Sequence, residues 1–270
     1  MKVTYQGESG AYSEMAVYKF FGSKTEPVPC KDFREVFESV KTGAVPHGVI
    51  PIENSIEGSV NQNYDLFLTY DLKVCGEVAV KLGHVLIGNP GTKIEDIKTV
   101  YSHPQALAQC RKYLEKHKWE IIPAYDTAGA VKIIKEKAEA NAAAIASEKA
   151  ADLYGMKILA RDIADNPSNY TRFLVLGLED AAPTGDDKTS IIFSLKHAPG
   201  TLYHAIGEFA SRNINLTRIE SRPTKTTAWQ YNFYVDFEGH RTEKRCAEAL
   251  AAIEKYANFI KILGSYPRVI

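Results

Sequence analysis

The chain has 270 residues, of which 45% are hydrophobic and 24% charged, a composition that excludes collagen-like and intrinsically disordered proteins. Its 33 Lys and Arg residues equal its 33 Asp and Glu residues, so no net charge attracts it to nucleic acid or anionic lipid. Any anionic ligand must therefore be bound by a local site.

The cysteines and the N-terminus indicate where the protein works. Four scattered cysteines form no CxxC motif and no cluster with histidine, which argues against a zinc site and favours free thiols in a reducing cytoplasm. The opening "MKVTYQGESG" predicts a strand, because it lacks the apolar run of about 7–15 residues that a signal peptide needs. The longest apolar runs are also far shorter than the ~20 residues of a membrane helix. We therefore expect a cytoplasmic protein without metal or membrane contact.

Strand-like and helix-like stretches alternate from residue 1 to about 180. Asp32 and Ser147 are suitable N-caps, and Pro104 can begin a helix because its missing N–H costs no hydrogen bond there. The pattern predicts an α/β domain with mainly parallel strands and helices on both faces. The strands are expected at "KVTYQ", "HGVIPIE", "TVYSH", "EIIPA" and "AAAIA", and the helices at residues 13–21, 33–43, 104–117, 126–140 and 147–155.

A different pattern begins after a stretch rich in Gly, Asp, Pro and Ala, at about residues 177–190. This stretch has no apolar period and is typical of a linker between domains. The remaining residues read as strand, helix, strand, strand, helix, strand, which is the ferredoxin-like order. The six elements are expected at residues 189–195, 201–212, 215–221, 228–239, 243–257 and 259–267.

Two polar stretches follow predicted strands in the first half of the chain. In "GESGAYSEM", the amides near Gly10 precede a helix that Ser9 or Ser13 could cap, so the stretch is either an ordinary turn or an anion site. It lacks the Lys-Ser/Thr ending of a P-loop, and no GxGxxG occurs in the chain. In "VIPIENSIEGSV", Glu53, Asn54 and Ser55 end a strand, where ligands of open α/β sheets bind; a helix-capping loop is the alternative.

The stretches "TVYSHPQALAQCRKY" and "NPSNYTRF" raise the same question. Ser102 and His103 end a strand, and Gln109 lies about two helical turns after Ser102. His103 suggests a base, but a structural hydrogen-bonding role is the alternative, since the sequence positions no partner for it. Thr171 and Arg172 stand at the beginning of an apolar strand, where a solvated surface loop is the alternative. Asn169 belongs to a glycosylation sequon, which means little without a secretory signal.

Together these stretches resemble the prephenate dehydratase family over nearly the whole chain. The resemblance is carried, in order, by "GESGAYSE", "PIENSIEGSV", "SHPQALAQC", "NYTRF", and an ACT-like segment with "PGTLYHAI" and "ESRP". It implies a two-lobed catalytic domain similar in layout to periplasmic binding proteins, at residues 1–180, with lobe 1 at about 1–78 and 168–180 and lobe 2 at about 79–167. An ACT regulatory domain is expected at 188–270.

The resemblance also implies the reaction and its residues. Prephenate would lose CO2 and water to give phenylpyruvate without a cofactor. The implied catalytic residues are Thr171, Arg172, Asn54, Ser55, Ser102 and Gln109. Substrate-binding roles are expected for Gly10, Ser13, Glu53, His103 and Phe173.

The chemistry explains why neutral side chains suit this site. Hydroxide is a poor leaving group, and a positioned donor accelerates such a step by ~10²–10⁴-fold. The resemblance assigns this role to Thr171, either as a hydrogen-bond donor or as a relay from a neighbour or water. A strong ion pair to the ring carboxylate would oppose decarboxylation, whereas neutral amides and hydroxyls oppose it less. Arg172, or the amides near Gly10, would hold the pyruvyl carboxylate.

The ACT segment is expected to bind L-Phe as a feedback inhibitor in a pocket shared between subunits of a dimer or dimer of dimers. The implied effector residues are Gly200, Thr201, Leu202, Asn213, Asn215, Glu220, Ser221, Arg222 and Pro223. The chain has Gly-Thr-Leu where the family usually has Gly-Ala-Leu. The added hydroxyl and methyl of Thr201 lie where they would change the effector pocket.

Two other functions remain open from the sequence. Arogenate dehydratases perform the same chemistry on a substrate with an amine in place of the keto group. A non-catalytic amino-acid sensor would combine a binding-protein-like double lobe with an ACT module. Detection of phenylpyruvate formed from prephenate without added cofactor separates these functions.

Overall fold

The computed structural model describes residues 1–224 and 229–269. Contacts within the chain divide it into two compact units: unit 1 is Met1–Leu66 with Val78–Phe173, and unit 2 is Phe67–Glu77 with Leu174–Ile270. Two strands, β5 (Lys73–Lys81) and β11 (Tyr170–Gly177), run from one unit into the other. Because this division cuts the chain at other residues, the domain and lobe limits expected from the sequence stay a prediction.

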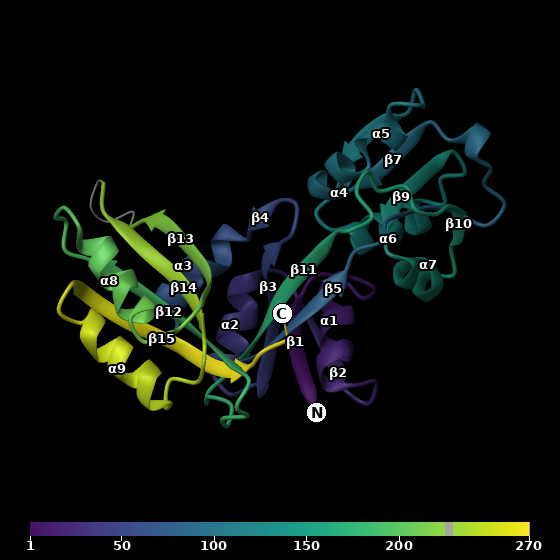
Figure 1. Ribbon diagram of the computed structural model, residues 1–270. Coiled ribbons are helices and arrows are strands. Elements are labelled where there is room, and N and C mark those ends of the chain that lie inside the picture. The colour runs from purple at the N-terminus through teal and green to yellow at the C-terminus, as the bar shows by residue number, and fades with distance from the viewer. Residues whose placement is uncertain (225–228, 270) are drawn as a thin grey trace. The chain divides into compact units, whose positions relative to one another are not determined.

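The first sheet has the strand order β2-β1-β3-β11-β5, with β4 paired to β3 (Figure 1). β1 runs parallel to β2 and to β3, whereas β4 is antiparallel to β3. The Ser55 amide donates to the Tyr170 carbonyl at 2.8 Å, so the carboxyl end of β3 meets the beginning of β11. The strands not yet bounded are β1 (Lys2–Gln6), β2 (Glu26–Cys30), β3 (His47–Asn54) and β4 (Gly58–Ser59).

Three helices accompany this sheet: α1 (Tyr12–Phe21), α2 (Phe33–Lys41) and α3 (Asn61–Thr69). The Asp32 carboxylate accepts from the Glu35 amide at 3.0 Å, which confirms the predicted cap of α2. The predicted cap of α1 is wrong. Its N-cap is Ala11, which makes no side-chain cap bond, and the Glu14 carboxylate instead accepts from the Gly10 amide at 2.7 Å.

The second sheet has the order β10-β6-β9-β7-β8 and mixes strand directions. β7 is parallel to β8 and β9, as predicted, but β6 is antiparallel to both β9 and β10. β6 and β10 are the first and last strands of this sheet along the chain. The strands are β6 (Val85–Gly88), β7 (Thr99–Ser102), β8 (Glu120–Pro123), β9 (Ala142–Ala146) and β10 (Lys157–Ala160).

Helices cover both faces of this second sheet, as the alternating pattern predicts. Ala144 of β9 packs in one core with α6 and α7, whereas its neighbour Ile145 packs in another with α4 and α5. The helix predicted at 104–117 is interrupted at Cys110, which separates α4 from α5. The helices are α4 (Pro104–Gln109), α5 (Arg111–Leu114), α6 (Thr127–Lys137), α7 (Glu148–Tyr154) and a 3₁₀ turn at Ile94–Asp96.

Unit 2 contains the predicted strand–helix–strand–strand–helix–strand order. Its antiparallel sheet has the order β13-β14-β12-β15, and α8 and α9 cover one face (Figure 1). The strand predicted at 228–239 begins at Ala228, which lies outside the described residues. The elements are β12 (Asp187–Leu195), α8 (Thr201–Ala210), β13 (Leu216–Pro223), β14 (Tyr231–Glu238), α9 (Lys244–Ile253) and β15 (Ala257–Pro267).

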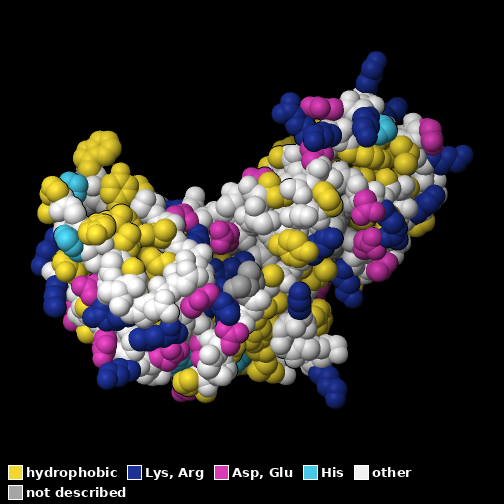
Figure 2. Space-filling model, in the orientation of Figure 1, with side chains coloured by type: hydrophobic (Ala, Val, Ile, Leu, Met, Phe, Trp, Pro, Cys, Tyr) yellow, Lys and Arg dark blue, Asp and Glu magenta, His cyan; other side chains and the backbone are white. Residues whose placement is uncertain are grey.

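Hydrophobic side chains gather on the surface of unit 2 around α8 (Figure 2). Tyr203 on α8 is 74% exposed, and Ile219 on the edge strand β13 is 48% exposed. Next to α8 lies a groove lined mainly by apolar side chains, including Ile206, Phe209 and Leu216. An exposed edge strand beside apolar side chains is a surface suited to contact with another chain.

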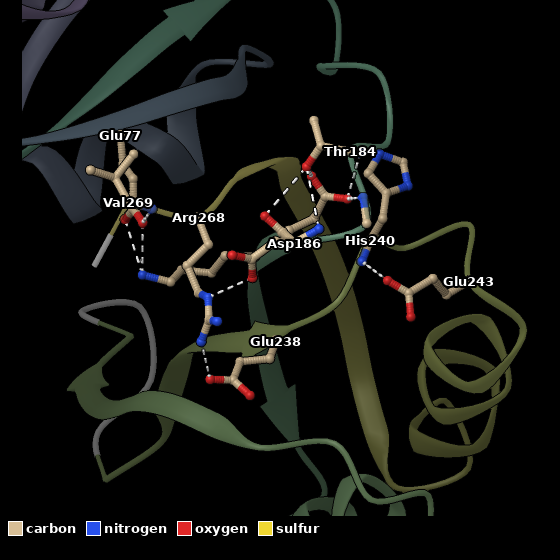
Figure 3. Close-up of polar contacts among 11 residues, drawn as sticks. Glu77, Thr184, Asp186, Glu238, His240, Glu243, Arg268 and Val269 are labelled. Carbon is tan, nitrogen blue, oxygen red and sulfur yellow. Dashed lines mark hydrogen bonds and ion pairs between the residues drawn. The ribbon is translucent and has the colours of Figure 1, made fainter.

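Charged side chains fasten the chain end to unit 2 (Figure 3). Arg268 forms ion pairs with Asp186 at 2.8 Å and with Glu238 at 2.6 Å, and the Val269 amide donates to the Glu77 carboxylate at 3.0 Å. The Glu77 carboxylate also accepts from Lys188 at 2.9 Å, and both of these side chains are buried. Glu77 on β5 is thereby held against β12 and the residues that follow β15.

Candidate active site

A cavity of about 380 Å³ lies in unit 1, between the residues that end β3 and those that begin α1, α4 and α6. Its volume falls within the roughly 300–1,000 Å³ of small-molecule sites. It is lined by Gln6, Ala11, Tyr12, Ser13, Phe33, Pro51, Asn54, Val60, Leu82, His103, Gln105, Tyr125, Asp126, Thr127, Thr171 and Phe173. Of the residues predicted from the sequence, it brings together Asn54, Thr171, Phe173, Ser13 and His103.

Three helices begin at this cavity. The lining includes the first residues of α1 and of α6, together with His103, which is the N-cap of α4. The amino ends of helices carry partial positive charge and unpaired amides, which favour bound carboxylates. The lining contains no Lys or Arg. The cavity therefore combines the partial positive charge of helix starts with a lining that, among the described residues, has no Lys or Arg and has Asp126 as its one acidic side chain.

The Thr171 hydroxyl is oriented by Asn54. The Asn54 Nδ2 group donates to Thr171 Oγ1 at 3.0 Å, and both side chains are buried. The Asn54 Oδ1 atom accepts from the amides of Ile56 and Glu57, at 3.0 Å each. Because the Thr171 oxygen accepts this bond, and its hydroxyl donates to no group among the described residues, its proton is available to a ligand in the cavity.

Asn54 also leads to a buried group of polar side chains. Its Nδ2 donates to Asn169 Oδ1 at 2.7 Å, and Asn169 Nδ2 donates to Gln109 Oε1 at 2.9 Å. The same Gln109 oxygen lies 2.8 Å from His84 Nε2. Gln109 Nε2 is buried and makes no hydrogen bond within the described part of the chain. The predicted residue Gln109 is thus joined to Thr171 through Asn169 and Asn54.

His103 and Asp126 form a titratable pair on the cavity wall. Burial lowers the pKa of His103, and the nearby Asp126 carboxylate partly offsets this. Burial raises the pKa of Asp126, which the Gly129 and Ala128 amides partly offset. His103 Nδ1 accepts from the Gln105 amide at 3.3 Å, so the neutral ring carries its proton on Nε2. A neutral His103 can therefore act as a second hydrogen-bond donor.

Four of the predicted catalytic residues do not line the cavity: Gln109, described above, and Ser55, Ser102 and Arg172. Ser55 is exposed and binds the 168–170 segment, where it accepts from the Tyr170 amide at 2.9 Å. The Ser102 hydroxyl is fully buried and donates to the Ile145 carbonyl at 2.6 Å. Arg172 stands between Thr171 and Phe173 on β11, and alternate side chains of a strand point to opposite faces. Its placement therefore gives no support to a contact with the substrate carboxylate.

Gly10 and Glu53 also differ from the expectation. The Gly10 amide already donates to Glu14, so it is not free to hold an anion. Gly10 instead allows a close approach, because a Cβ there would lie 2.9 Å from the Ala150 Cα atom. Glu53 precedes Asn54 on β3, pairs with Ser59 and does not line the cavity.

The sequence did not identify several residues of the site. Tyr125 and Asp126 precede α6, and the sequence indicated only that a helix begins there. Asn169 was noted in the sequence only as part of a glycosylation sequon, and none of the sequence motifs described above contains His84. The position of His84 depends on contacts with Gln109 and Tyr12, which lie 25 and 72 positions away in the chain and which no local pattern reveals.

The predicted effector residues lie in three places in unit 2. Thr201 and Leu202 line a cavity of about 100 Å³ at the start of α8, where Gly200 is the N-cap with φ +83°. Glu220, Ser221, Arg222 and Pro223 lie on the edge strand β13, paired to β14. Asn213, with φ +53°, and Asn215 precede β13, and Asn215 lines the groove beside α8. These residues do not enclose one cavity within a single chain.

Among the described residues, no group of three or more His, Cys, Asp or Glu side chains is arranged to hold a metal ion. Within that same part of the chain, the helices are all too short or too polar to cross a membrane.

Comparisons with known proteins cover almost the whole chain. Residues 3–181 match the family described as prephenate dehydratase, and residues 189–255 match the ACT domain. A prephenate dehydratase from Methanocaldococcus jannaschii is 44% identical, covering 98% of this chain and 97% of the relative. An arogenate dehydratase/prephenate dehydratase 2 from Arabidopsis thaliana is 46% identical, covering 99% of this chain and 73% of the relative. A prephenate dehydratase structure from Arthrobacter aurescens in complex with L-Phe has a TM-score of 0.91 and 34% identity, covering 99% of this chain and 90% of the other.

Proposed function

The chain belongs to the prephenate dehydratase family and carries a C-terminal ACT domain, and from this premise we propose that it converts prephenate to phenylpyruvate, CO2 and water. The observation that carries the proposal is the Thr171 hydroxyl, which Asn54 holds with its proton free to donate into the cavity. Prephenate has two carboxylates, which fits a cavity at which three helices begin.

Thr171 donates a hydrogen bond to the ring hydroxyl as it leaves, and the departing hydroxide takes one proton from solvent to become water. Hydroxide departs poorly without a donor, and Thr171 Oγ1 keeps its proton for this step because Asn54 supplies the bond that the oxygen accepts. His103 Nε2–H is the second neutral donor on the wall. The C–C bond between the ring and its carboxylate breaks, and its electron pair enters the ring as the C–O bond breaks. The carboxylate leaves as CO2, and the ring becomes aromatic.

The ring carboxylate must be held without being stabilised too strongly. An ion pair to it would favour the ground state over the transition state and so slow decarboxylation. The lining of the cavity contains no Lys or Arg, so amides and hydroxyls bind the carboxylates instead. The pyruvyl carboxylate takes no part in the bond changes and is bound at a helix start.

Arogenate is the second candidate substrate, because Asp126 lines the cavity. Arogenate carries an amine where prephenate carries a keto group, and a carboxylate is the natural partner of that amine. Asp126→Asn keeps a side-chain oxygen to cap α6, where Asp126 now accepts from the Gly129 amide at 2.9 Å. We expect this variant to lose activity on arogenate and to keep activity on prephenate.

The decisive experiment uses purified protein, no added cofactor and each substrate in parallel. Phenylpyruvate from prephenate is followed by ultraviolet absorbance, and phenylalanine from arogenate by chromatography. We expect phenylpyruvate to form faster. Phenylalanine alone would make the protein an arogenate dehydratase, and no product from either substrate would indicate a non-catalytic sensor.

Thr171→Val tests the residue that carries the proposal. It should lower kcat by ~10²–10⁴-fold with little change in KM, because it removes only the donor. Thr25→Val is the matched control, since Thr25 is equally buried and its hydroxyl only donates to the Phe21 carbonyl at 3.3 Å. Normal kcat in Thr171→Val would remove Thr171 from the chemistry.

The ACT domain is proposed to bind L-Phe at a site completed by a second copy of the chain. The cavity at Thr201 and Leu202 is about 100 Å³, smaller than usual ligand sites, while the edge strand β13 and the groove beside α8 are open to a partner. We expect a dimer or dimer of dimers by analytical ultracentrifugation, and inhibition by L-Phe that Gly200→Val relieves. Unchanged inhibition in this variant would place the effector elsewhere.

The cytoplasm is the proposed location. All four cysteines are free thiols, and burial raises the pKa of Cys110 to about 12, so this thiol stays protonated and unreactive.

A further inference from the structure

Four buried amide and imidazole side chains form one continuous chain of hydrogen bonds in unit 1. The chain runs from Asn54 to Asn169 to Gln109 to His84, over distances of 2.7, 2.9 and 2.8 Å. Each side chain is at most 7% exposed. They come from the end of β3, the segment before β11, the end of α4 and the segment between β5 and β6.

At one end of this series of hydrogen bonds, the backbone fixes which side-chain atom donates and which accepts. Asn54 Oδ1 accepts from two backbone amides, which can only donate, so Asn54 must turn its Nδ2 toward Asn169. Asn169 must then accept with Oδ1 and donate with Nδ2. Gln109 in turn must present Oε1, which already accepts from Asn169.

Gln109 Oε1, at the other end of this series of hydrogen bonds, therefore needs a donor facing it, and His84 supplies that donor. Its Nε2 faces Gln109 Oε1, which defines the tautomer with the proton on Nε2. His84 Nδ1 lies 3.3 Å from the Tyr12 hydroxyl, which donates to the Gly83 carbonyl at 2.7 Å. Burial lowers the pKa of His84, which agrees with a neutral ring.

The donor-to-acceptor direction of these hydrogen bonds determines how the Thr171 hydroxyl is held. Asn54 Nδ2 donates both to Asn169 Oδ1 and to Thr171 Oγ1. If Asn169 turned its Nδ2 toward Asn54, two donors would face each other and the Asn54 side chain would be displaced. The Thr171 hydroxyl would then lose the partner that leaves its proton free.

We propose that Asn169 and His84 are positioning residues for the dehydration: they hold Asn54 in the one orientation in which the Thr171 hydroxyl donates to the substrate. Neither residue lines the cavity, so both act through other side chains. The inference rests on the proposed donor role of Thr171.

The test compares kcat and KM on prephenate for Asn169→Leu and Asn63→Leu. Asn63 is the matched control, because it is also fully buried in unit 1 and donates to the Pro51 carbonyl at 2.6 Å, outside the chain of bonds. A misplaced reacting group costs ~10²-fold, so Asn169→Leu should lower kcat to about that extent with KM little changed. Asn63→Leu should keep its kcat even where it lowers the melting temperature.

A pair of variants at His84 tests the other end, also in case Asn169→Leu does not fold. His84→Leu removes the donor and should lower kcat by about tenfold or more, whereas His84→Gln places an NH2 group where Nε2 stood and should restore it. If both His84 variants share the wild-type kcat, or if His84→Gln falls as far as His84→Leu, the positioning role is wrong.

The outcomes separate this inference from the proposed function. If the wild-type protein forms no phenylpyruvate or phenylalanine, the proposed function fails. If the wild type is active and Thr171→Val is not, but Asn169→Leu and His84→Leu keep normal kcat, the function stands and the inference is overturned.

Discussion

Gly10 lies where the turn before α1 comes closest to α7. Its φ is +90°, and a Cβ there would lie 2.9 Å from Ala150 Cα. Gly155 is the matched control, since its φ is +65° and a Cβ would meet nothing within 4 Å. Ala at Gly155 should cost ~1–2 kcal/mol of stability from backbone strain alone. Ala at Gly10 should cost about 1–3 kcal/mol more, because overpacking adds to the strain.

Urea unfolding of the Gly10→Ala and Gly155→Ala variants measures this difference. Equal losses of stability would mean that the approach to Ala150 adds nothing beyond the backbone conformation. A raised KM in Gly10→Ala alone would show that the contact also places the beginning of α1 at the cavity.

Single residues of the site were predictable from the sequence only where a motif names them. Thr171 and Asn54 stand in such motifs, and the structure places them 3.0 Å apart. Arg172 was expected to hold the pyruvyl carboxylate with its guanidinium group, but strand geometry sends the side chains of neighbouring residues to opposite faces. Asp126 and His84 belong to no motif, since their roles depend on contacts that only the folded chain creates.

Ser147 shows how one side chain can serve two elements. Its hydroxyl accepts from the Ala150 amide at 3.1 Å to cap α7, as predicted, and donates to the Gly10 carbonyl at 2.8 Å. Ser147→Ala should therefore cost the ~1 kcal/mol of a lost cap and a further ~1–3 kcal/mol for a buried carbonyl without its partner. Asp32→Ala, which loses the cap of α2, is the control and should cost only the first amount.

Thermal and urea unfolding of both variants give the comparison. A loss in Ser147→Ala no larger than in Asp32→Ala would mean that the bond to Gly10 contributes nothing to stability.

The order of helices and strands was predictable because it rests on local signals. Asp32, Pro104 and Ser147 mark helix starts, and each confirmed helix begins within one residue of its mark. The interruption at Cys110 and the antiparallel placement of β6 were not predictable, because both depend on the packing of segments distant in sequence.

The buried pair of Glu77 and Lys188 fastens β5 to β12 in unit 2. Their side chains are 0% and 3% exposed. Removing one partner leaves a buried charge uncompensated, so Glu77→Leu or Lys188→Met should each destabilise by about 3–5 kcal/mol. The double variant Glu77→Leu with Lys188→Met should recover much of this loss, since no charge remains buried.

A double-mutant cycle in urea checks this pair. Losses that simply add in the double variant would show that the two charges do not interact across β5 and β12.

The stability of the molecule should depend on pH through two histidines. Burial lowers the pKa of both His84 and His103 in the folded chain, although the Gln109 bond and Asp126, respectively, partly oppose this. In the unfolded chain histidine titrates at about 6.5. Between the lowered pKa and that value the unfolded chain binds more protons, so acid favours unfolding. The contribution of both histidines is thus fully present above about pH 6.5.

We therefore expect the free energy of unfolding to fall as the pH is lowered from about 7.5 through 6.5 and below, at constant ionic strength. Urea titrations across this range measure it. His103→Gln should make the dependence shallower without abolishing it, because His84 still titrates. Asp126 acts in the opposite direction at lower pH: burial raises its pKa, so the folded chain gains stability as the pH approaches the ordinary value for a carboxyl group. A free energy of unfolding that rises on acidification from neutral pH would show that neither histidine is held in its neutral form by burial.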